Sequence, residues 1–441
     1  MFGPRFPRRP RDGHATGALN IASTLRPRYH PCVPEPTSPS NAAAAARSAA
    51  PRSAATAPTT ARSAAGAPGA TRTATPRPAR RTTRSSREAA PPVLVEVHRG
   101  ETIESRHRGH VVQVDEAGEI VRAAGTPSTA VMLRSTVKPF ALVALIESGA
   151  ADDLGLTPSE LAIMCSSHTG EDKHVRTLQA IFRRASVTQA ALRCGSEGAP
   201  ADTLTAARLS RDGEAPSAIR HGCSGFHAAS ILMSAHAGWS IDDYAEPGHA
   251  SQIAVRDTVA RLFGRHPGSL KTSPDNCGVL TYEVLLVDLA RAYLLLADPD
   301  GPVAGPDQAS SAPALKRVRD AMMGAPDMVG GTHDNLDTEL MRRRPGALVA
   351  KAGADGLRAI GLLAGPSSPA GGMAIKIEDG DLSRRAITAV TVEALAQVGV
   401  LDDRDLRAMA AFHHPAVHTP DRREAAAALP RFELAPLGEL T

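Results

Sequence analysis

Cysteine is scarce in this sequence, and long apolar runs are missing from it. Five cysteines are scattered over 441 residues, and an odd number spread so widely does not indicate a disulfide framework. No run of eighteen apolar residues occurs, which excludes a transmembrane helix at the level of the sequence. The chain also lacks a charged and then apolar leader that ends in small residues, so we expect a cytoplasmic location.

Lysine is absent from the first ninety residues, which carry 15 arginines and three acids, Asp12, Glu35 and Glu88. The remaining 35 basic and 43 acidic residues make the rest of the chain mildly acidic, although the whole has a net charge of +4. A basic balance is typical of proteins that bind nucleic acids or anionic membranes. Because only the tail is basic here, we expect neither partner for the rest of the chain.

The tail, residues 1–92, is rich in Ala, Pro, Arg, Ser and Thr and has few large apolar side chains. Such a segment cannot recover the conformational entropy that folding costs, which predicts disorder. A nucleic-acid-binding arm or an organelle transit peptide are alternatives, and a dispensable extension is the favoured interpretation. The second region, residues 93–441, is predicted to be one catalytic domain.

The pattern of the body predicts an α+β fold. Apolar and polar residues alternate over 93–100 and 110–121, which indicates antiparallel strands. Helical patterns follow, including a stretch at 138–147 that is apolar almost all round, and 280–297 also reads as helical throughout. Strands return at 347–363 and 372–382, and a helix at 384–399 closes the pattern. One antiparallel sheet built from both chain ends, with helices on its faces, satisfies this order.

The most informative stretch is Arg134-Ser135-Thr136-Val137-Lys138-Pro139, where a strand region ends and the apolar helix begins. A serine and a lysine three apart at a helix start lie on one face, and the amine can activate the hydroxyl if its pKa falls from about 10.4 towards 7. Lysine is rare here, with six in the whole chain, and Lys138 lies among apolar residues. A second lysine, Lys351, lies in a predicted strand and resembles the Lys-x-Gly element of serine β-lactamases.

Three further clusters contain polar or thiol side chains. The segment 165–171 (CSSHTGE) is a candidate site loop or an ordinary turn, and the other two clusters are 222–227 (GCSGFH) and 275–278 (DNCG). Cys223 and Cys277 could share a metal or be buried thiols, which are the commoner case.

Together these segments resemble the rhizobial-type L-asparaginase family, over about residues 93–429. The resemblance rests on VEVHRG, RSTVKP, SSHTGE, CGSEGAP, the CSG-x-H block, DNCGV, MVGGT and AKAGADG, in that order. It implies a fold like that of serine β-lactamases and penicillin-binding proteins. It also implies a homodimer.

The resemblance assigns roles residue by residue. The nucleophilic serine falls on Ser135 and its partner lysine on Lys138, while the second serine and the second lysine of the site fall on Ser167 and Lys351. The family's zinc site uses two cysteines, which fall on Cys223 and Cys277, and a lysine. In this chain the position of that lysine holds Phe226, which cannot bind zinc. A two-thiolate site completed by His227 or water stays open.

The implied activity is hydrolysis of L-asparagine to L-aspartate and ammonia. Charge makes Arg134 a candidate for the α-carboxylate and Asp275 for the α-ammonium, and His168 is a further candidate for substrate contact. Two alternatives remain: another amide hydrolase of the same fold, acting on glutamine or a β-lactam, and a metabolite-binding protein without catalysis. The retained Ser135 and lysine pair favour an enzyme.

Overall fold

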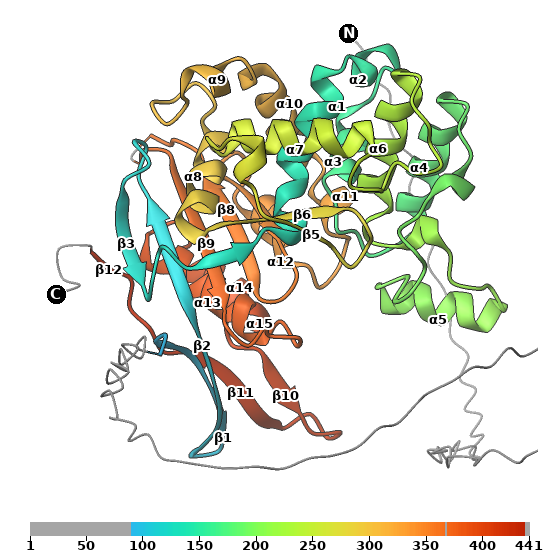
Figure 1. The fold of residues 1–441 in the computed structure, drawn as a ribbon. Helices are drawn as coiled ribbons and strands as arrows, with labels where there is room; N and C mark the ends of the chain where they lie inside the picture. The colour runs from blue at the N-terminus through green and yellow to red at the C-terminus, as the bar shows by residue number, and fades with distance from the viewer. Residues whose placement is uncertain (1–89, 367, 437–441) are drawn as a thin grey trace, which may run out of the picture. The chain divides into compact units, whose positions relative to one another are not determined.

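The computed structural model describes residues 90–366 and 368–436 (Figure 1). The predicted disordered tail lies outside the described residues, apart from its last three positions. The first strand, β1 (Val93–Arg99), begins where the sequence predicted ordered structure to start. No helix in the described part of the chain is both long and apolar enough to cross a membrane.

The main sheet joins strands from the two ends of the described chain. After β1 these are β2 (Thr102–Val114), β3 (Ile120–Ala124), β7 (Leu348–Ala352), β8 (Leu357–Leu362), β9 (Gly371–Ile377), β10 (Ala416–His418), β11 (Glu424–Pro430) and β12 (Ala435–Pro436). The order is β10-β11-β1-β2-β9-β8-β7, and β3 pairs with β2 and β12. All pairs are antiparallel, and β2 meets β9 from Gly109↔Ile377 to Val114↔Gly372. The α+β architecture with a sheet from both ends is therefore confirmed.

Helices fill the middle of the chain and close its C-terminal part (Figure 1). They are α1 (Lys138–Glu147), α2 (Ala150–Asp153), α3 (Pro158–Met164), α4 (Asp172–Arg184), α5 (Thr203–Asp212), α6 (Ser224–His236), α7 (Ala250–Leu262), α8 (Leu286–Ala297), α9 (Pro306–Ala309), α10 (Ala312–Gly324), α11 (Pro326–Val329), α12 (Leu336–Arg343), α13 (Arg385–Gln397), α14 (Asp403–Ala408) and α15 (Ala410–His413). Eight residues of α1 are buried, from Lys138 to Leu145, which confirms the predicted buried helix.

The prediction of one helix over 280–297 is wrong at its start. Residues Leu280–Leu285 form strand β6, which pairs with β4 (Ala130–Met132) and β5 (Thr272–Pro274) in a small second sheet. A short apolar run fits a helix or a strand equally well by its periodicity. Pairing with β4, which is distant in the sequence, and with β5, across a turn, stabilises the strand.

Strand alternation places two basic side chains on opposite faces of the main sheet. Gly361 of β8 faces α8, because a Cβ added there would lie 2.3 Å from a carbonyl oxygen of that helix. Gly361 pairs with Val349 of β7, so Lys351, two residues further, also faces α8. Arg358 pairs with Ala352 and therefore points to the other face, where α13 packs.

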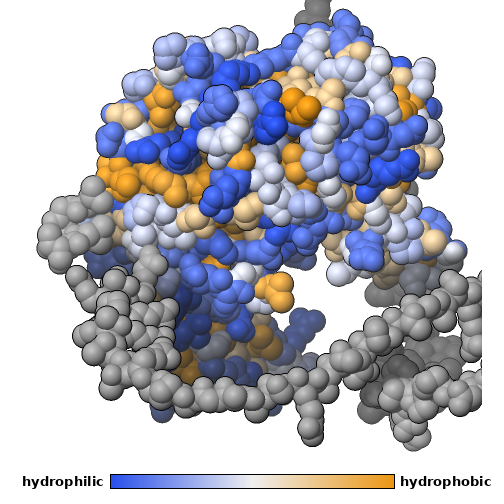
Figure 2. Space-filling view, viewed as in Figure 1, coloured by the Kyte–Doolittle hydropathy of each residue, from blue (hydrophilic) through white to orange (hydrophobic). Residues whose placement is uncertain are grey.

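The surface seen in Figure 2 is mostly hydrophilic over the helical part of the molecule. A hydrophobic patch gathers towards the side on which β3 lies in Figure 1. Apolar atoms make up much of the surface of any folded domain, so this patch alone identifies no site.

Candidate active site

Ser135 lies in a short 3₁₀ turn, η1 (Arg134–Val137), directly before α1. The turn is held from two sides: Thr281 Oγ1 accepts the N–H of Arg134 at 2.8 Å, and the hydroxyl of Tyr293 donates to Thr136 O at 3.0 Å. Arg134 has a positive φ of 47°, a conformation that costs a non-glycine residue free energy and that is common at functional sites. Ser135 is thus half-buried on a fixed turn at the start of a buried helix.

Lys138 is the first residue of α1 and is 1 % exposed. Its Nζ donates to Ser166 O at 2.5 Å, to Ser167 Oγ at 3.3 Å and to Cys223 Sγ at 3.3 Å. An ammonium has three N–H groups, so these acceptors use all of them. The buried lysine that the sequence predicted therefore has a polar environment of its own.

Lys351 approaches the same hydroxyl from strand β7 and is fully buried. Its Nζ donates to Ser167 Oγ at 3.0 Å and to Ala352 O at 2.8 Å. Burial lowers the pKa of Lys351 to about 7; the charge of Asp337 opposes this shift, and that of Lys138 adds to it. Near neutral pH this amine is therefore available in its uncharged form.

Ser167 connects the two lysines through its single hydroxyl group. Its own backbone N–H donates to Val329 O at 3.0 Å, which fixes the loop against the end of α11. The structure thus brings Lys138, Ser167 and Lys351 together from three separate parts of the chain. Both lysines bond Ser167, and within the described residues the hydroxyl of Ser135 makes no hydrogen bond to either of them.

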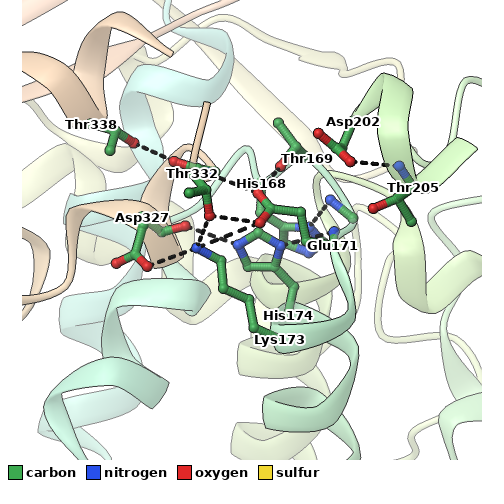
Figure 3. A network of polar contacts seen from close by, with 12 residues as sticks. His168, Thr169, Glu171, Lys173, His174, Asp202, Thr205, Asp327, Thr332 and Thr338 are labelled. Carbon is green, nitrogen blue, oxygen red and sulfur yellow. Dashed lines mark hydrogen bonds and ion pairs between the residues drawn. The ribbon is translucent and has the colours of Figure 1, made fainter. Parts of the chain in front are cut away.

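A polar network behind this loop holds it in place (Figure 3). The carboxylate of Glu171 accepts hydrogen bonds from Thr332 N at 2.8 Å, Thr332 Oγ1 at 2.7 Å and Thr169 Oγ1 at 2.7 Å. Burial acts to raise the pKa of Glu171, but these hydrogen bonds and Lys173 outweigh it and lower the pKa to about 2. Lys173 also binds Asp327 Oδ2 at 2.7 Å. The segment 165–171 is therefore held in place by several hydrogen bonds, and its role as a site loop stays a prediction.

His168 is buried in the same network and is 1 % exposed. Its Nδ1 accepts from Gly170 N at 3.0 Å, its Nε2 contacts Ser224 Oγ at 2.9 Å, and its ring stacks on that of His174. Burial lowers the pKa of His168 well below its ordinary value, which keeps the ring neutral. These partners favour a supporting role, and contact with substrate stays a prediction.

A cluster of charges lies beside Ser135. Arg134 Nε donates to Asp275 Oδ1 at 2.6 Å, and its Nη1 pairs with Asp355 Oδ2. Asp355 lies at the turn between β7 and β8 and, like Arg134, has a positive φ, of 56°. The sequence predicted Arg134 and Asp275 as site residues but missed Asp355. The available signal was its place four residues after Lys351, in an Asp-Gly pair that we interpreted only as a turn.

A comparison with protein families matches the family described as L-asparaginase II over residues 95–428. The chain belongs to the L-asparaginase II family. A comparison with curated proteins finds no match. The matched region contains six of the site candidates: Ser135, Lys138, Ser167, Cys223, Cys277 and Lys351.

Solved structures give more distant similarities. The chain is 13 % identical to Mglu in its native form, with a TM-score of 0.35. The match covers 68 % of this chain and 66 % of Mglu, just under two thirds of the length of Mglu. For a Bacillus glutaminase crystallised in the presence of 4.3 M NaCl, the identity is 11 % and the TM-score is 0.33, over 66 % of this chain and 91 % of that one. For a beta-lactamase from Burkholderia ambifaria, the identity is 15 % and the TM-score is 0.30, over 67 % of this chain and 96 % of that one.

The two cysteines of this L-asparaginase II relative lie together beside Lys138. The thiols of Cys223 and Cys277 are in hydrogen-bond contact, and that contact, followed by the charge of Lys138, lowers the pKa of Cys223 against the opposing effect of burial. Phe226 is 4 % exposed, and its ring centroid lies 5.7 Å from Lys138 Nζ. The sulfur of Cys223 therefore has Lys138 Nζ as its partner, at 3.3 Å.

These side chains do not fit the three-ligand zinc centre that the family resemblance implies. Two thiols are present, but the third position is Phe226, and the described residues contain no group of three His, Cys, Asp or Glu placed to hold a metal ion. His227 is bonded through Nδ1 to Tyr244 Oη at 2.7 Å. A protein zinc site normally has at least three protein ligands. Zinc binding stays a prediction.

Proposed function

We propose that this protein is an L-asparaginase that hydrolyses L-asparagine to L-aspartate and ammonia with Ser135 as nucleophile. Membership of the L-asparaginase II family supports an amidohydrolase. The observation that carries the proposal is the buried lysine pair around Ser167, next to the turn of Ser135. Two buried amines on one hydroxyl are costly to a fold, and they supply the titratable base that a serine nucleophile needs.

The proton of Ser135 has a route through this cluster. Burial lowers the pKa of Lys351 to about 7, so above that pH Lys351 can accept a proton. Lys138 gives a proton to the Ser167 hydroxyl, which passes its own to Lys351; Lys138 is then neutral, three residues from Ser135. The neutral amine takes the proton of Ser135 as its oxygen attacks the side-chain amide carbon.

The remaining steps balance with water as the only further reactant. Backbone N–H groups at the start of α1 stabilise the oxyanion. Collapse of the intermediate breaks the C–N bond, and ammonia leaves with the proton that Lys138 holds. An ester of Ser135 remains, and water, deprotonated along the same route, releases aspartate and restores the hydroxyl.

The charge cluster supplies recognition of an α-amino acid. Arg134 suits the α-carboxylate, because a guanidinium can bind a carboxylate through two parallel hydrogen bonds in a bidentate geometry. Asp275 and Asp355 occupy this guanidinium in the structure. Asp355 is exposed at a turn, so the substrate carboxylate can displace it, while Asp275 remains for the α-ammonium.

Replacing Arg134 with Gln tests this recognition. We expect kcat/KM for L-asparagine to fall by about 10-fold to 100-fold, mostly through KM, because a hydrogen bond to a charged group contributes about 1.5–3 kcal/mol. The matched control is Arg106→Gln, an exposed arginine on β2 that pairs with Glu96 and should behave as wild type. A loss confined to kcat, with KM unchanged, would argue against carboxylate binding by Arg134.

Activity should rise with pH up to about 7 and level off above it. The base must be uncharged, and burial lowers the pKa of Lys351 to about 7, so the active fraction is lost as pH falls below that value. The expected slope is about tenfold in kcat/KM per pH unit on the acid side. The check is a profile of kcat/KM for L-asparagine across this range, and a profile flat through neutrality contradicts the assignment.

Chelation should leave turnover unchanged. Lys138 already pairs with the thiolate of Cys223, and Phe226 replaces the third ligand of the family site. The measurement compares ammonia release by the full chain after treatment with a chelator and after addition of zinc. Activity that is lost on chelation and restored by zinc would show that the two thiols do hold a required metal.

The test of the function is ammonia release by the full chain from L-asparagine and from L-glutamine, with a chromogenic β-lactam as a third substrate. We expect L-asparagine to be the best of the three. Preference for glutamine or the lactam would assign another amide hydrolase of this fold, and no turnover of any would favour a binding protein. A homodimer in the cytoplasm remains the expectation, to be checked by light scattering and cell fractionation.

A further inference from the structure

Asp337 is a buried carboxylate beside strand β7 that no step of the proposed reaction uses. It lies in the first turn of α12 and is 2 % exposed. Its Oδ1 accepts from Arg358 Nη1 at 2.6 Å, and its Oδ2 accepts the backbone N–H of Ala352 at 2.8 Å. Desolvation of two buried charges can cost as much as their attraction returns, so stability alone does not explain such a pair. One side chain thus joins α12 to the two strands that carry Lys351 and Arg358.

The backbone groups on the outer edge of β7 are bonded within the protein next to Lys351. β7 ends the described sheet order, and Gly353 N donates towards β8, to Leu357 O, at 2.8 Å. Successive residues of an antiparallel ladder alternate in the direction of their backbone groups, so the N–H and the C=O of Ala352 both point away from β8. Asp337 binds that N–H, and Lys351 Nζ donates to that carbonyl at 2.8 Å. The two backbone groups of one residue therefore fix both the carboxylate and the amine.

Lys351 is fully buried, so nearby charges act on its amine with little screening by water. Burial is the largest cause that lowers its pKa, to about 7, and the charges of Asp337 and Cys223 oppose this shift. Those of Lys138 and Arg358 add to it. The titratable groups that act on this amine come from five elements and are Asp337 of α12, Arg358 of β8, Lys138 of α1, Cys223 at the N-cap of α6 and, at the C-cap of α3, the thiol of Cys165, whose pKa burial raises to about 12. Asp337 contributes the carboxylate of this group.

Asp337 and Arg358 have opposite effects on Lys351, although they bond to one another. Arg358 is 4 % exposed and points to the sheet face opposite to that of Lys351. The hydrogen bonds of Lys351 Nζ go to Ser167 Oγ and to Ala352 O. The pair therefore acts on the amine through its two charges and through the position of Ala352.

We propose that Asp337 is a positioning residue for Lys351, which fixes Ala352 and, against Arg358, sets the charge on the lysine amine. This role deepens the proposed asparaginase mechanism and rests on it only for the effect on turnover. The charge on the amine itself can be followed without any substrate. The chain contains six lysines in all, so carbon-13 signals of the lysine Cε atoms are few enough to follow one by one.

Two single variants should move the titration of Lys351 in opposite directions. Asp337→Asn keeps an acceptor for the N–H of Ala352 but removes the negative charge that favours the ammonium, so the midpoint should fall by about one pH unit or more. Arg358→Gln keeps a donor for Asp337 but removes a cation, so the midpoint should rise by about the same amount. The two changes together should leave it near the wild-type value. A merely structural disturbance would not produce shifts of opposite sign.

The test follows the lysine Cε signals of the full chain across neutral pH, with Lys351→Met to identify the signal of Lys351. The acid limb of kcat/KM for L-asparagine, measured over the same range, should move with it. Glu339→Gln removes a carboxylate that pairs with Arg343 on the same helix, and this matched control should titrate as the wild type. Arg358→Lys retains the positive charge and should also leave the midpoint in place.

Midpoints that stay at the wild-type value in both single variants, or that move in the same direction, would overturn the proposal. Thermal melting shows which variants fold, and either single variant alone predicts a direction that can fail. A wild type that hydrolyses no amide would contradict the proposed function, while the carbon-13 midpoints would still decide the role of Asp337.

Discussion

Ser135→Ala is expected to lower ammonia release from L-asparagine by about 10⁴-fold or more, as removal of a serine nucleophile does in other hydrolases. The fold should survive, because the turn is held by Thr281 and Tyr293 rather than by the Ser135 hydroxyl. The variant should therefore melt at the temperature of the wild type and still bind substrate. Ammonia release under single-turnover conditions measures the effect.

The control for this variant is Ser159→Ala, which removes an exposed hydroxyl from the first turn of α3. It should be as active as wild type. If Ser135→Ala also keeps normal turnover, the nucleophile lies elsewhere, and Ser167 between the two lysines becomes the first residue to examine.

Lys351→Met should be the second most damaging change. Methionine fills a similar buried volume but removes the amine that holds the mobile proton. General-base catalysis contributes about 10²-fold to 10⁴-fold, so we expect a loss of kcat in that range. The acid limb of the pH profile near 7 should disappear as well, because it is assigned to the lowered pKa of Lys351. The pH profile separates this role from a merely structural one.

Lys316→Met serves as its control, since this lysine lies on α10 and pairs with Asp300. Its rate and its pH profile should match those of the wild type. A Lys351→Met protein that is slow but retains a limb near pH 7 would mean that another group titrates there, and Lys138 would then be the base without help from Lys351.

Local sequence patterns predicted the parts of the structure that depend on near neighbours. The apolar helix with an embedded Lys138, the turn at Asp355–Gly356 and the strands at 93–100 and 347–363 all follow from periodicity and turn chemistry. The strand β11 was not predicted, because EAAAALP has no strand preference of its own. It becomes a strand by pairing with β1, more than three hundred residues away in the chain.

The site was predictable in its residues and only partly in its contacts. The family resemblance brought Ser135, Lys138, Ser167 and Lys351 into one proposal. The structure places both lysines within hydrogen-bond reach of Ser167. Pairing of Arg134 with Asp355, or of Lys138 with Cys223, is set by how distant segments pack. No spacing along the chain encodes such contacts, and they can be found only in the folded molecule.

The measurement that tests the central claim most directly is rapid acid quenching of the full chain during its first turnover of L-asparagine, followed by mass spectrometry of its peptides. The account predicts an aspartyl ester on the peptide of Ser135, formed as fast as ammonia appears and missing in Ser135→Ala. Ammonia released at the normal rate with no ester on Ser135, or with the ester on Ser167, would contradict it.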